Sequence, residues 1–133
     1  MAWSIGDNGF DITLSSYVPR IIHAHLRRVV VAQMERANLT LDTVQRWAVH
    51  PGGRDILDKV EAALGLEPDA LAVSRAVLRD VGNLSSATLF FVLEALLRAP
   101  AAAPGENICA LAFGPGLTAE LGFFSPHGGG SMI

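Results

Sequence analysis

Residues 47–53 read Trp47-Ala48-Val49-His50-Pro51-Gly52-Gly53, an apolar run that meets a proline and two glycines. From Ile56 to Leu64, apolar residues recur at helical spacing, and Gly65 follows. The pattern predicts a strand that ends at His50 and a helix that ends at Gly65. Because His50 precedes a proline, its backbone is driven towards an extended conformation, and its ring projects from the strand end. The two glycines allow a ligand or another backbone segment to approach closely.

The remaining sequence predicts strands and helices that alternate after an opening hairpin. Short β-prone runs at 3–5 and 10–14 flank a group of turn formers at 6–9. Further along the chain we expect helices at 18–37, 70–81 and 87–98, and strands at 108–113 and 117–124. This order favours an α/β domain at 1–124, with a mixed β-sheet layered with helices, followed by a flexible tail at 125–133.

The composition narrows the class of protein. The 133 residues suit one domain, half of them are apolar, and the mean hydropathy of +0.36 rules out general disorder. A net charge of −3 argues against nucleic acid as a partner. One cysteine excludes an intramolecular disulfide framework and a multi-cysteine zinc site. The sequence has no visible signal peptide and no apolar run long enough to cross a bilayer, so we expect no membrane association and a cytoplasmic location.

Two polar junctions each lead into an apolar helix. His50 stands at one, and Asn83 stands at the other, within Gly82-Asn83-Leu84-Ser85-Ser86. A neutral imidazole and a carboxamide both have N–H donors, so if they converge they can stabilise an enolate or a tetrahedral oxyanion. Each residue also has an ordinary structural interpretation, as a hydrogen-bonding histidine before a turn and as an asparagine within a turn or cap.

Other candidate sites have weaker support. Cys109 is surrounded by apolar residues of a predicted strand, so we interpret it as a packing residue with an inert thiol. His23 and His25 are two residues apart on a predicted helix, which argues against a shared metal ion. The sequence contains no nucleotide-binding fingerprint and no zincin motif. We therefore expect no metal and no resident cofactor.

The order and spacing of the motifs resemble those of a known family. The segments His50-Pro51-Gly52-Gly53, Gly82-Asn83-Leu84-Ser85-Ser86 and Phe113-Gly114-Pro115-Gly116-Leu117-Thr118-Ala119-Glu120 resemble the C-terminal half of the chalcone and stilbene synthases, the type III polyketide synthases. The opening segments 3–10 and 14–19 look like the bacterial branch. The resemblance implies the C-terminal half of a thiolase-like fold. It also implies that His50 and Asn83 are catalytic, holding the thioester oxygen of malonyl-CoA while it loses CO₂.

The same resemblance implies substrate-binding residues and substrates. Gly52, Gly53 and Arg54 match the segment beside bound coenzyme A, and Ser85 matches a position that influences chain length. The loop of Phe113, Gly114, Pro115 and Gly116 matches the one that shapes the cyclisation cavity, and Ile12 falls near a gatekeeper position. The implied substrates are malonyl-CoA and an acyl-CoA starter, both coenzyme A thioesters. The starter, the number of extensions and the cyclisation mode depend on a cavity shared with the other half.

The chain departs from the family in one large respect. The family's nucleophilic cysteine lies in the N-terminal half, which is absent from this sequence, and Cys109 does not match it. We therefore expect acyltransferase activity only in the full-length protein, with the isolated chain inactive. Without the N-terminal half, helix 87–98 would lose part of its cover. We expect an exposed apolar patch there, and self-association or a homodimer.

Two alternatives stay open from the sequence. A ketoacyl synthase of the initiating type also uses Cys, His and Asn, although its histidine is usually followed by Gln-Ala-Asn, where this chain has Pro51-Gly52-Gly53. The other alternative is a non-catalytic α/β module that serves in binding or oligomerisation.

Overall fold

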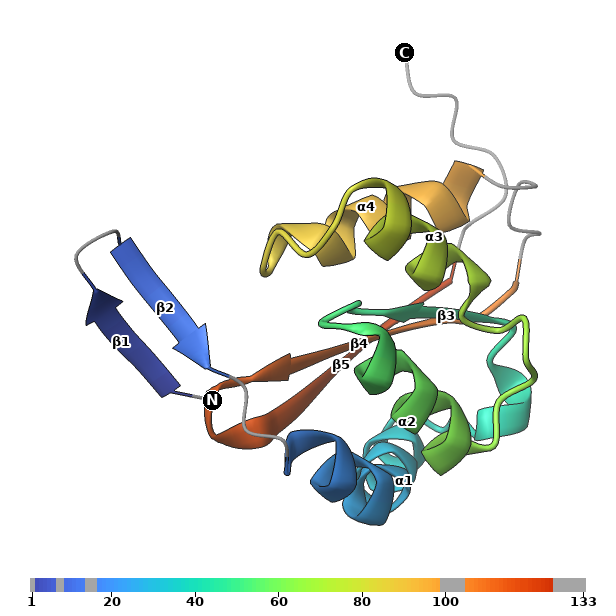
Figure 1. The fold of residues 1–133 in the computed structure, drawn as a ribbon. Helices are drawn as coiled ribbons and strands as arrows, with labels where there is room; N and C mark the ends of the chain where they lie inside the picture. Colours follow the sequence, from blue (N-terminus) through green and yellow to red (C-terminus); the bar gives the residue numbers. More distant parts are fainter. Residues whose placement is uncertain (1, 7–8, 14–16, 99–104, 126–133) are drawn as a thin grey trace.

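The computed structural model describes residues 2–6, 9–13, 17–98 and 105–125 (Figure 1). Their elements, in chain order, are β1 (Ala2–Gly6), β2 (Gly9–Thr13), α1 (Val18–Arg36), a 3₁₀ turn (Leu41–Thr43), β3 (Arg46–Val49), α2 (Arg54–Leu64), α3 (Ala72–Asp80), α4 (Ala87–Arg98), β4 (Ile108–Gly114), a second 3₁₀ turn (Pro115–Leu117) and β5 (Thr118–Phe124). The predicted tail lies outside the described residues from position 126 onwards.

The central sheet has three strands in the order β3-β4-β5. The strands β3 and β4 are parallel, with Trp47 opposite Cys109 and Val49 opposite Leu111, whereas β4 and β5 are antiparallel. The prediction of a mixed sheet is therefore confirmed. The opening hairpin is also confirmed, but β1 and β2 pair only with each other and form a separate two-stranded sheet that projects from the rest in Figure 1.

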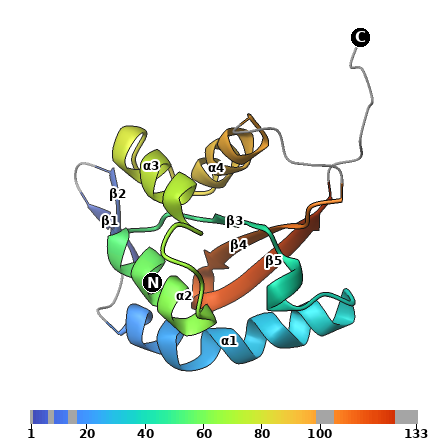
Figure 2. The same cartoon turned by 90° about the vertical axis from the view of Figure 1, so that its right-hand side faces the viewer.

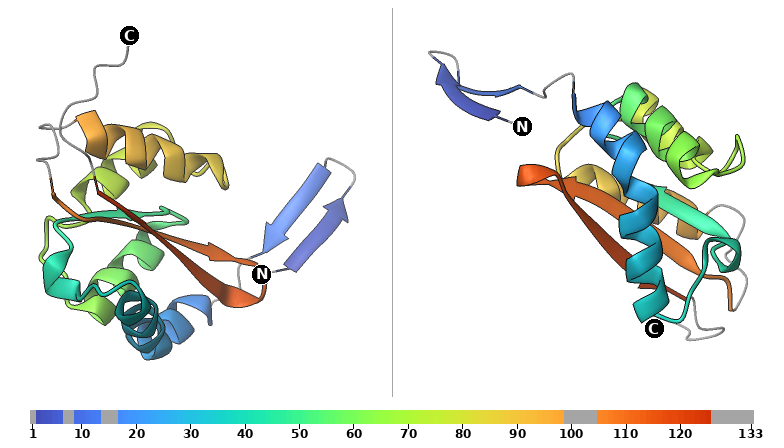
Figure 3. Two further views of the ribbon diagram at one scale, coloured as in Figure 1. Left: turned by 180° about the vertical axis from the view of Figure 1, so that it is seen from behind. Right: turned by 90° about the horizontal axis from the view of Figure 1, so that it is seen from below.

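Helices cover both faces of the central sheet, with α1 and α2 on one side and α3 and α4 on the other (Figure 2). Successive side chains of a strand point to opposite faces. Trp47, Val49, Cys109 and Leu111 pack into a core with α1 and α2, and Ala48 and Ala110 pack into a smaller core with α3 and α4. The view from below in Figure 3 shows α1 running along the sheet as a single long helix.

Local sequence explains where the helices begin and end. The apolar stripe of α2 is buried, and Gly65 ends the helix in the left-handed conformation (φ +67°), where glycine has no steric penalty. Helix α3 is shorter than predicted because residues 68–71 form turns before it. Its Arg75 makes ion pairs with Asp58 (2.7 Å) and Glu61 (3.0 Å), which tie α3 to α2.

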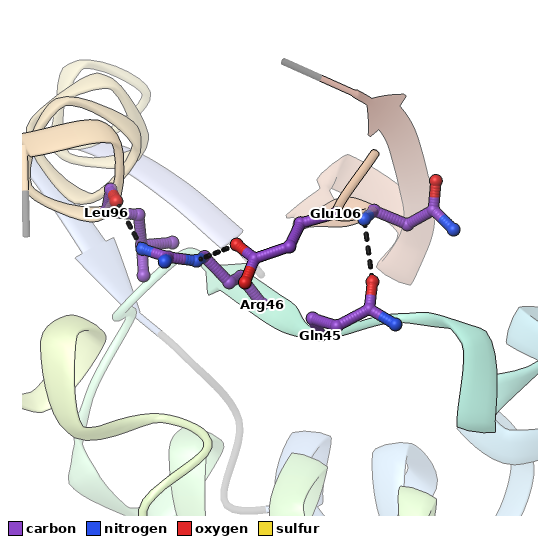
Figure 4. A network of polar contacts seen from close by, with 5 residues as sticks. Gln45, Arg46, Leu96 and Glu106 are labelled. Carbon is purple, nitrogen blue, oxygen red and sulfur yellow. Dashed lines mark hydrogen bonds and ion pairs between the residues drawn. The ribbon is translucent and has the colours of Figure 1, made fainter. Parts of the chain in front are cut away.

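A polar cluster links the start of β3 with the start of β4 and the end of α4 (Figure 4). Arg46 Nε pairs with Glu106 Oε2 at 2.7 Å, and its Nη1 donates to the carbonyl of Leu96 at 2.9 Å. Beside this pair, the backbone N–H of Asn107 donates to the side chain of Gln45 at 2.7 Å. These contacts lie at the end of β3 opposite to His50.

Candidate active site

The first part of the site is the corner at the carboxyl end of β3. The backbone N–H of His50 donates to the carbonyl of Leu111 at 2.8 Å, which extends the β3–β4 pairing by one residue before Pro51 turns the chain. The His50 ring is half-buried, and its Cδ2–Nε2 edge lies beside Gly52, within 3.9 Å of where a Cβ atom at that position would stand. Burial lowers the pKa of the His50 imidazole, which favours the neutral ring.

The second part is the loop between α3 and α4. The Oδ1 of Asn83 accepts a hydrogen bond from the backbone N–H of Ser85 at 2.9 Å, so the carboxamide oxygen is held inside its own loop. This leaves the amide nitrogen facing outwards, and Nδ2 donates to the carbonyl of Gly52 at 3.2 Å. Ser85 adopts a left-handed conformation (φ +59°), which is uncommon for a residue with a side chain and often marks functional loops.

The two junctions predicted from sequence therefore meet at Gly52. The Asn83 amide donates to the carbonyl of Gly52, and the His50 ring edge lies 3.8 Å from where a Cβ atom on Gly52 would stand. Thirty-one residues separate Gly52 from Asn83, so the contact depends on the tertiary fold. An imidazole and a carboxamide at one corner can present two N–H donors to a developing negative charge.

The Phe113–Gly116 loop lies at the same edge of the sheet. Because β3 and β4 are parallel, their carboxyl ends share one edge. Gly114 ends β4 three residues beyond Leu111, whose carbonyl accepts the hydrogen bond from the His50 N–H. A Cβ at Gly114 would stand 2.7 Å from Oγ1 of Thr118, so a larger residue there would force the Thr118 side chain to shift. Gly116 has φ +72°, and the half-buried Phe113 packs against the larger core.

The other predicted substrate-binding residues lie on separate elements of the fold. Gly53 precedes α2 as its N-terminal cap, and Arg54 is exposed on its first turn. Ser85 is exposed in the Asn83 loop. Ile12 lies on β2, in the separate hairpin, and its side chain is outside what the structure describes, as is that of Pro115.

Cys109 is buried, as predicted. It is fully inaccessible on β4, on the α1–α2 side of the sheet, and burial raises the pKa of its thiol to about 12. A thiol in this state is a poor nucleophile because the thiolate is the reactive form.

Two residues with polar contacts next to the site were not predicted as site residues from the sequence. Ser74 and Thr88 are fully buried, on α3 and α4. Each stands on an apolar stripe, Ser74 between Leu71 and Val77, and Thr88 in line with Val92 and Leu96. A hydroxyl at a core-facing helical position was the available signal, because buried polar groups need partners.

No group of three or more potential metal ligands occurs within the described part of the chain. In the same residues, no helix has both the length and the apolar character needed to cross a membrane.

Comparison with known proteins settles the family. The model of the C-terminal domain of chalcone and stilbene synthases matches residues 1–124. The chain belongs to this family. Among curated relatives, bisdemethoxycurcumin synthase of Oryza sativa subsp. japonica is 54% identical over 79 residues, or 56% of this chain and 20% of that protein. A putative chalcone synthase of Bacillus subtilis (strain 168) is 30% identical over 125 residues, or 94% of this chain and 34% of that protein.

Solved structures of the family have the same fold. The polyketide synthase PKS-I of the brown alga Ectocarpus siliculosus matches with a TM-score of 0.80 and 33% identity, over 92% of this chain and 34% of that one. The C-terminal type III polyketide synthase domain of Steely1 from Dictyostelium matches with a TM-score of 0.83 and 26% identity, over 94% and 35%. The predicted thiolase-like C-terminal fold is confirmed. This chain spans 20% to 35% of the length of these four proteins.

Proposed function

We propose that this chain forms the C-terminal part of a type III polyketide synthase, in which His50 and Asn83 stabilise the enolate formed when malonyl-CoA loses CO₂. The observation that supports this most directly is the hydrogen bond from Asn83 Nδ2 to the Gly52 carbonyl, which holds the carboxamide against the His50 corner. The Ser85 N–H fixes which end of the amide faces that corner, so a donor and not an acceptor is directed at it.

The proposed reaction begins with cleavage of the bond between the malonyl α-carbon and its carboxylate. CO₂ leaves, and the electron pair remains on the acetyl unit as an enolate whose thioester oxygen is negative. A neutral His50 N–H and the second N–H of the Asn83 amide then donate to that oxygen. The enolate carbon attacks an acyl thioester carried on a cysteine, so that a carbon–carbon bond forms and the cysteine leaves as thiolate.

The nucleophilic cysteine would come from an N-terminal part of the enzyme. Cys109 is unsuited to that role because it is inaccessible and its pKa is raised to about 12. The isolated chain would therefore not condense acyl groups. Gly52, Gly53 and Arg54 would line the path of coenzyme A, and Phe113 to Gly116 would border the cavity for the growing chain.

One side of α4 is apolar and exposed to solvent, as expected for a surface that another part of the full-length enzyme covers. Phe90 is 71% exposed and Leu97 is 53% exposed. They lie seven residues apart, and therefore on one side of the helix. We propose that another part of the full-length enzyme covers this side, and that the isolated chain self-associates through it.

The test measures CO₂ release from malonyl-CoA by the protein that contains this chain. His50→Ala and Asn83→Ala should each lower the rate by about a hundredfold to a thousandfold, because each removes one oxyanion donor. His25→Ala on the exposed side of α1 and Asn107→Ala, immediately before β4, serve as matched controls and should leave the rate unchanged. Unchanged CO₂ release in both site variants would remove His50 and Asn83 from the reaction.

A further inference from the structure

Two polar side chains are fully buried in the part of the chain whose side chains the structure describes, Ser74 on α3 and Thr88 on α4. Both belong to the layer that covers one face of the sheet, and both accept a hydrogen bond from a backbone N–H outside their own helix. The two bonds have different donors and different acceptors, so they are separate observations.

Ser74 braces the histidine corner. The N–H of Val49 donates to Oγ of Ser74 at 3.2 Å. The N–H of the next residue, His50, points the other way and donates to Leu111 of β4. The Val49 N–H therefore faces the other edge of β3, where the described residues provide no neighbouring strand. Ser74 thus supplies the acceptor that a further strand would otherwise supply, one residue before the imidazole.

Thr88 braces the asparagine loop in the same manner. The N–H of Leu84 donates to Oγ1 of Thr88 at 2.7 Å, and the N–H of Thr88 donates back to the carbonyl of Ser85 at 3.1 Å. This reciprocal pair fixes the loop on the first turn of α4, one residue after Asn83. Leu84 itself is exposed, so its side chain does not hold the loop in the core.

We propose that Ser74 and Thr88 are positioning residues, a pair of buried hydroxyls that set the relative placement of His50 and Asn83 by holding the backbone next to each. The proposal rests on the function proposed above. Both residues are fully buried, so their proposed effect is on the backbone that they hold. They act because a displacement of about 1 Å at a catalytic group can reduce a rate by about a hundredfold.

The experiment measures kcat and KM for the decarboxylation of malonyl-CoA, with the melting temperature of every variant. Ser74→Ala and Thr88→Val remove the hydroxyls and should each lower kcat by about tenfold, with KM within about twofold. Ser74→Thr and Thr88→Ser keep a hydroxyl and should recover kcat to within about threefold of the unmodified protein.

Matched controls separate positioning from stability. Val77→Ala on α3 and Val92→Ala on α4 truncate buried side chains of the same core and should lower the melting temperature without lowering kcat. Unchanged kcat in Ser74→Ala and Thr88→Val, or an equal loss of kcat in the two valine variants, would overturn the proposal. If the Ser74 variants fail to fold, the Thr88 pair decides, because Thr88→Ser removes only a methyl group.

His50→Ala and Asn83→Ala, measured alongside, tell the two proposals apart. A loss of CO₂ release in these variants without a loss in Ser74→Ala and Thr88→Val refutes the positioning role alone. No loss in any of the four refutes the proposed function, and the positioning role with it.

Discussion

The two faces of the central sheet differ in how completely this chain covers them. On one face, α1 and α2 close over Trp47, Val49 and Leu111, and side chains such as Met34 and Leu57 are almost fully buried. On the other face, α3 and α4 cover two alanines, and the outer side of α4 leaves Phe90, Phe91 and Leu97 in solvent. The prediction of exposed apolar side chains on helix 87–98 is confirmed.

The difference lies in α4, which is rich in apolar residues but buries few of them. Helix α2 buries its apolar stripe and exposes most of its charged residues, as expected for a surface helix. Helix α4 is apolar on several sides, and only Thr88, Val92 and Leu96 are buried. Large exposed aromatic side chains on one helix are typical of an interface. The closed face therefore stabilises this chain, whereas the open face is suited to association.

The largest expected effect is on the stability of the closed face. Leu57→Ala should lower the free energy of unfolding by about 3 kcal/mol, because it removes a fully buried side chain and leaves a cavity. Leu97→Ala, the same change at a half-exposed position on the open face, should lower it by less than about 0.5 kcal/mol. Urea denaturation measures both values. Equal losses would mean that the two faces do not differ in the way described.

A smaller effect is expected on self-association through the open face. The double variant Phe90→Ser, Leu97→Ser should weaken dimerisation of the isolated chain by about tenfold or more, because it removes two exposed apolar side chains. Ile21→Ser serves as the control, since Ile21 is 45% exposed on α1, on the closed side of the sheet. Sedimentation velocity over a range of concentrations measures the change. A monomer at every concentration would contradict the role of α4.

The smallest effect concerns pH. Burial lowers the pKa of His50 below its unfolded value, so the unfolded chain binds a proton more readily than the folded one. Stability should therefore fall as the pH drops below about 6.5, the ordinary pKa of histidine, and should be constant above it as far as this group is concerned. His50→Gln should remove that part of the pH dependence. His25→Gln, on the exposed side of α1, is the matched control, and urea midpoints between pH 5 and 8 measure both.

The sequence predicted the elements well because their signals are local. The repeat from Ile56 to Leu64 and the stop at Gly65 match the ends of α2 and its left-handed cap. Turns explain where an observed boundary differs from the predicted one. The last strand was predicted to begin at Leu117, but β5 begins at Thr118 because Pro115–Leu117 forms a 3₁₀ turn. The sequence pattern did not predict that the hairpin at residues 2–13 forms a sheet of its own. Alternation of apolar and polar residues identifies a strand but not the strand with which it pairs.

The candidate site was predicted in its residues but not in its contacts. The motifs identified two polar corners in the sequence. The contact between Asn83 and Gly52 joins segments that are far apart in the chain, and it forms only because α3 packs against β3. The bracing hydroxyls were missed for the same reason. Ser74 and Thr88 stand on apolar stripes, which is a signal of burial, but the backbone groups that they hold lie in other segments and are known only from the fold. The roles of Arg54, Ser85, Ile12 and the Phe113–Gly116 loop stay predictions.

The polar cluster around Arg46 and Glu106 has a practical use. It stands at the start of β3, the length of the strand away from His50, which is about 13 Å for four extended residues. A fluorophore or an immobilisation tether attached beside it would leave the opposite edge open to solution. The proposed binding of coenzyme A thioesters could then be tested with the reporter kept clear of the incoming molecule.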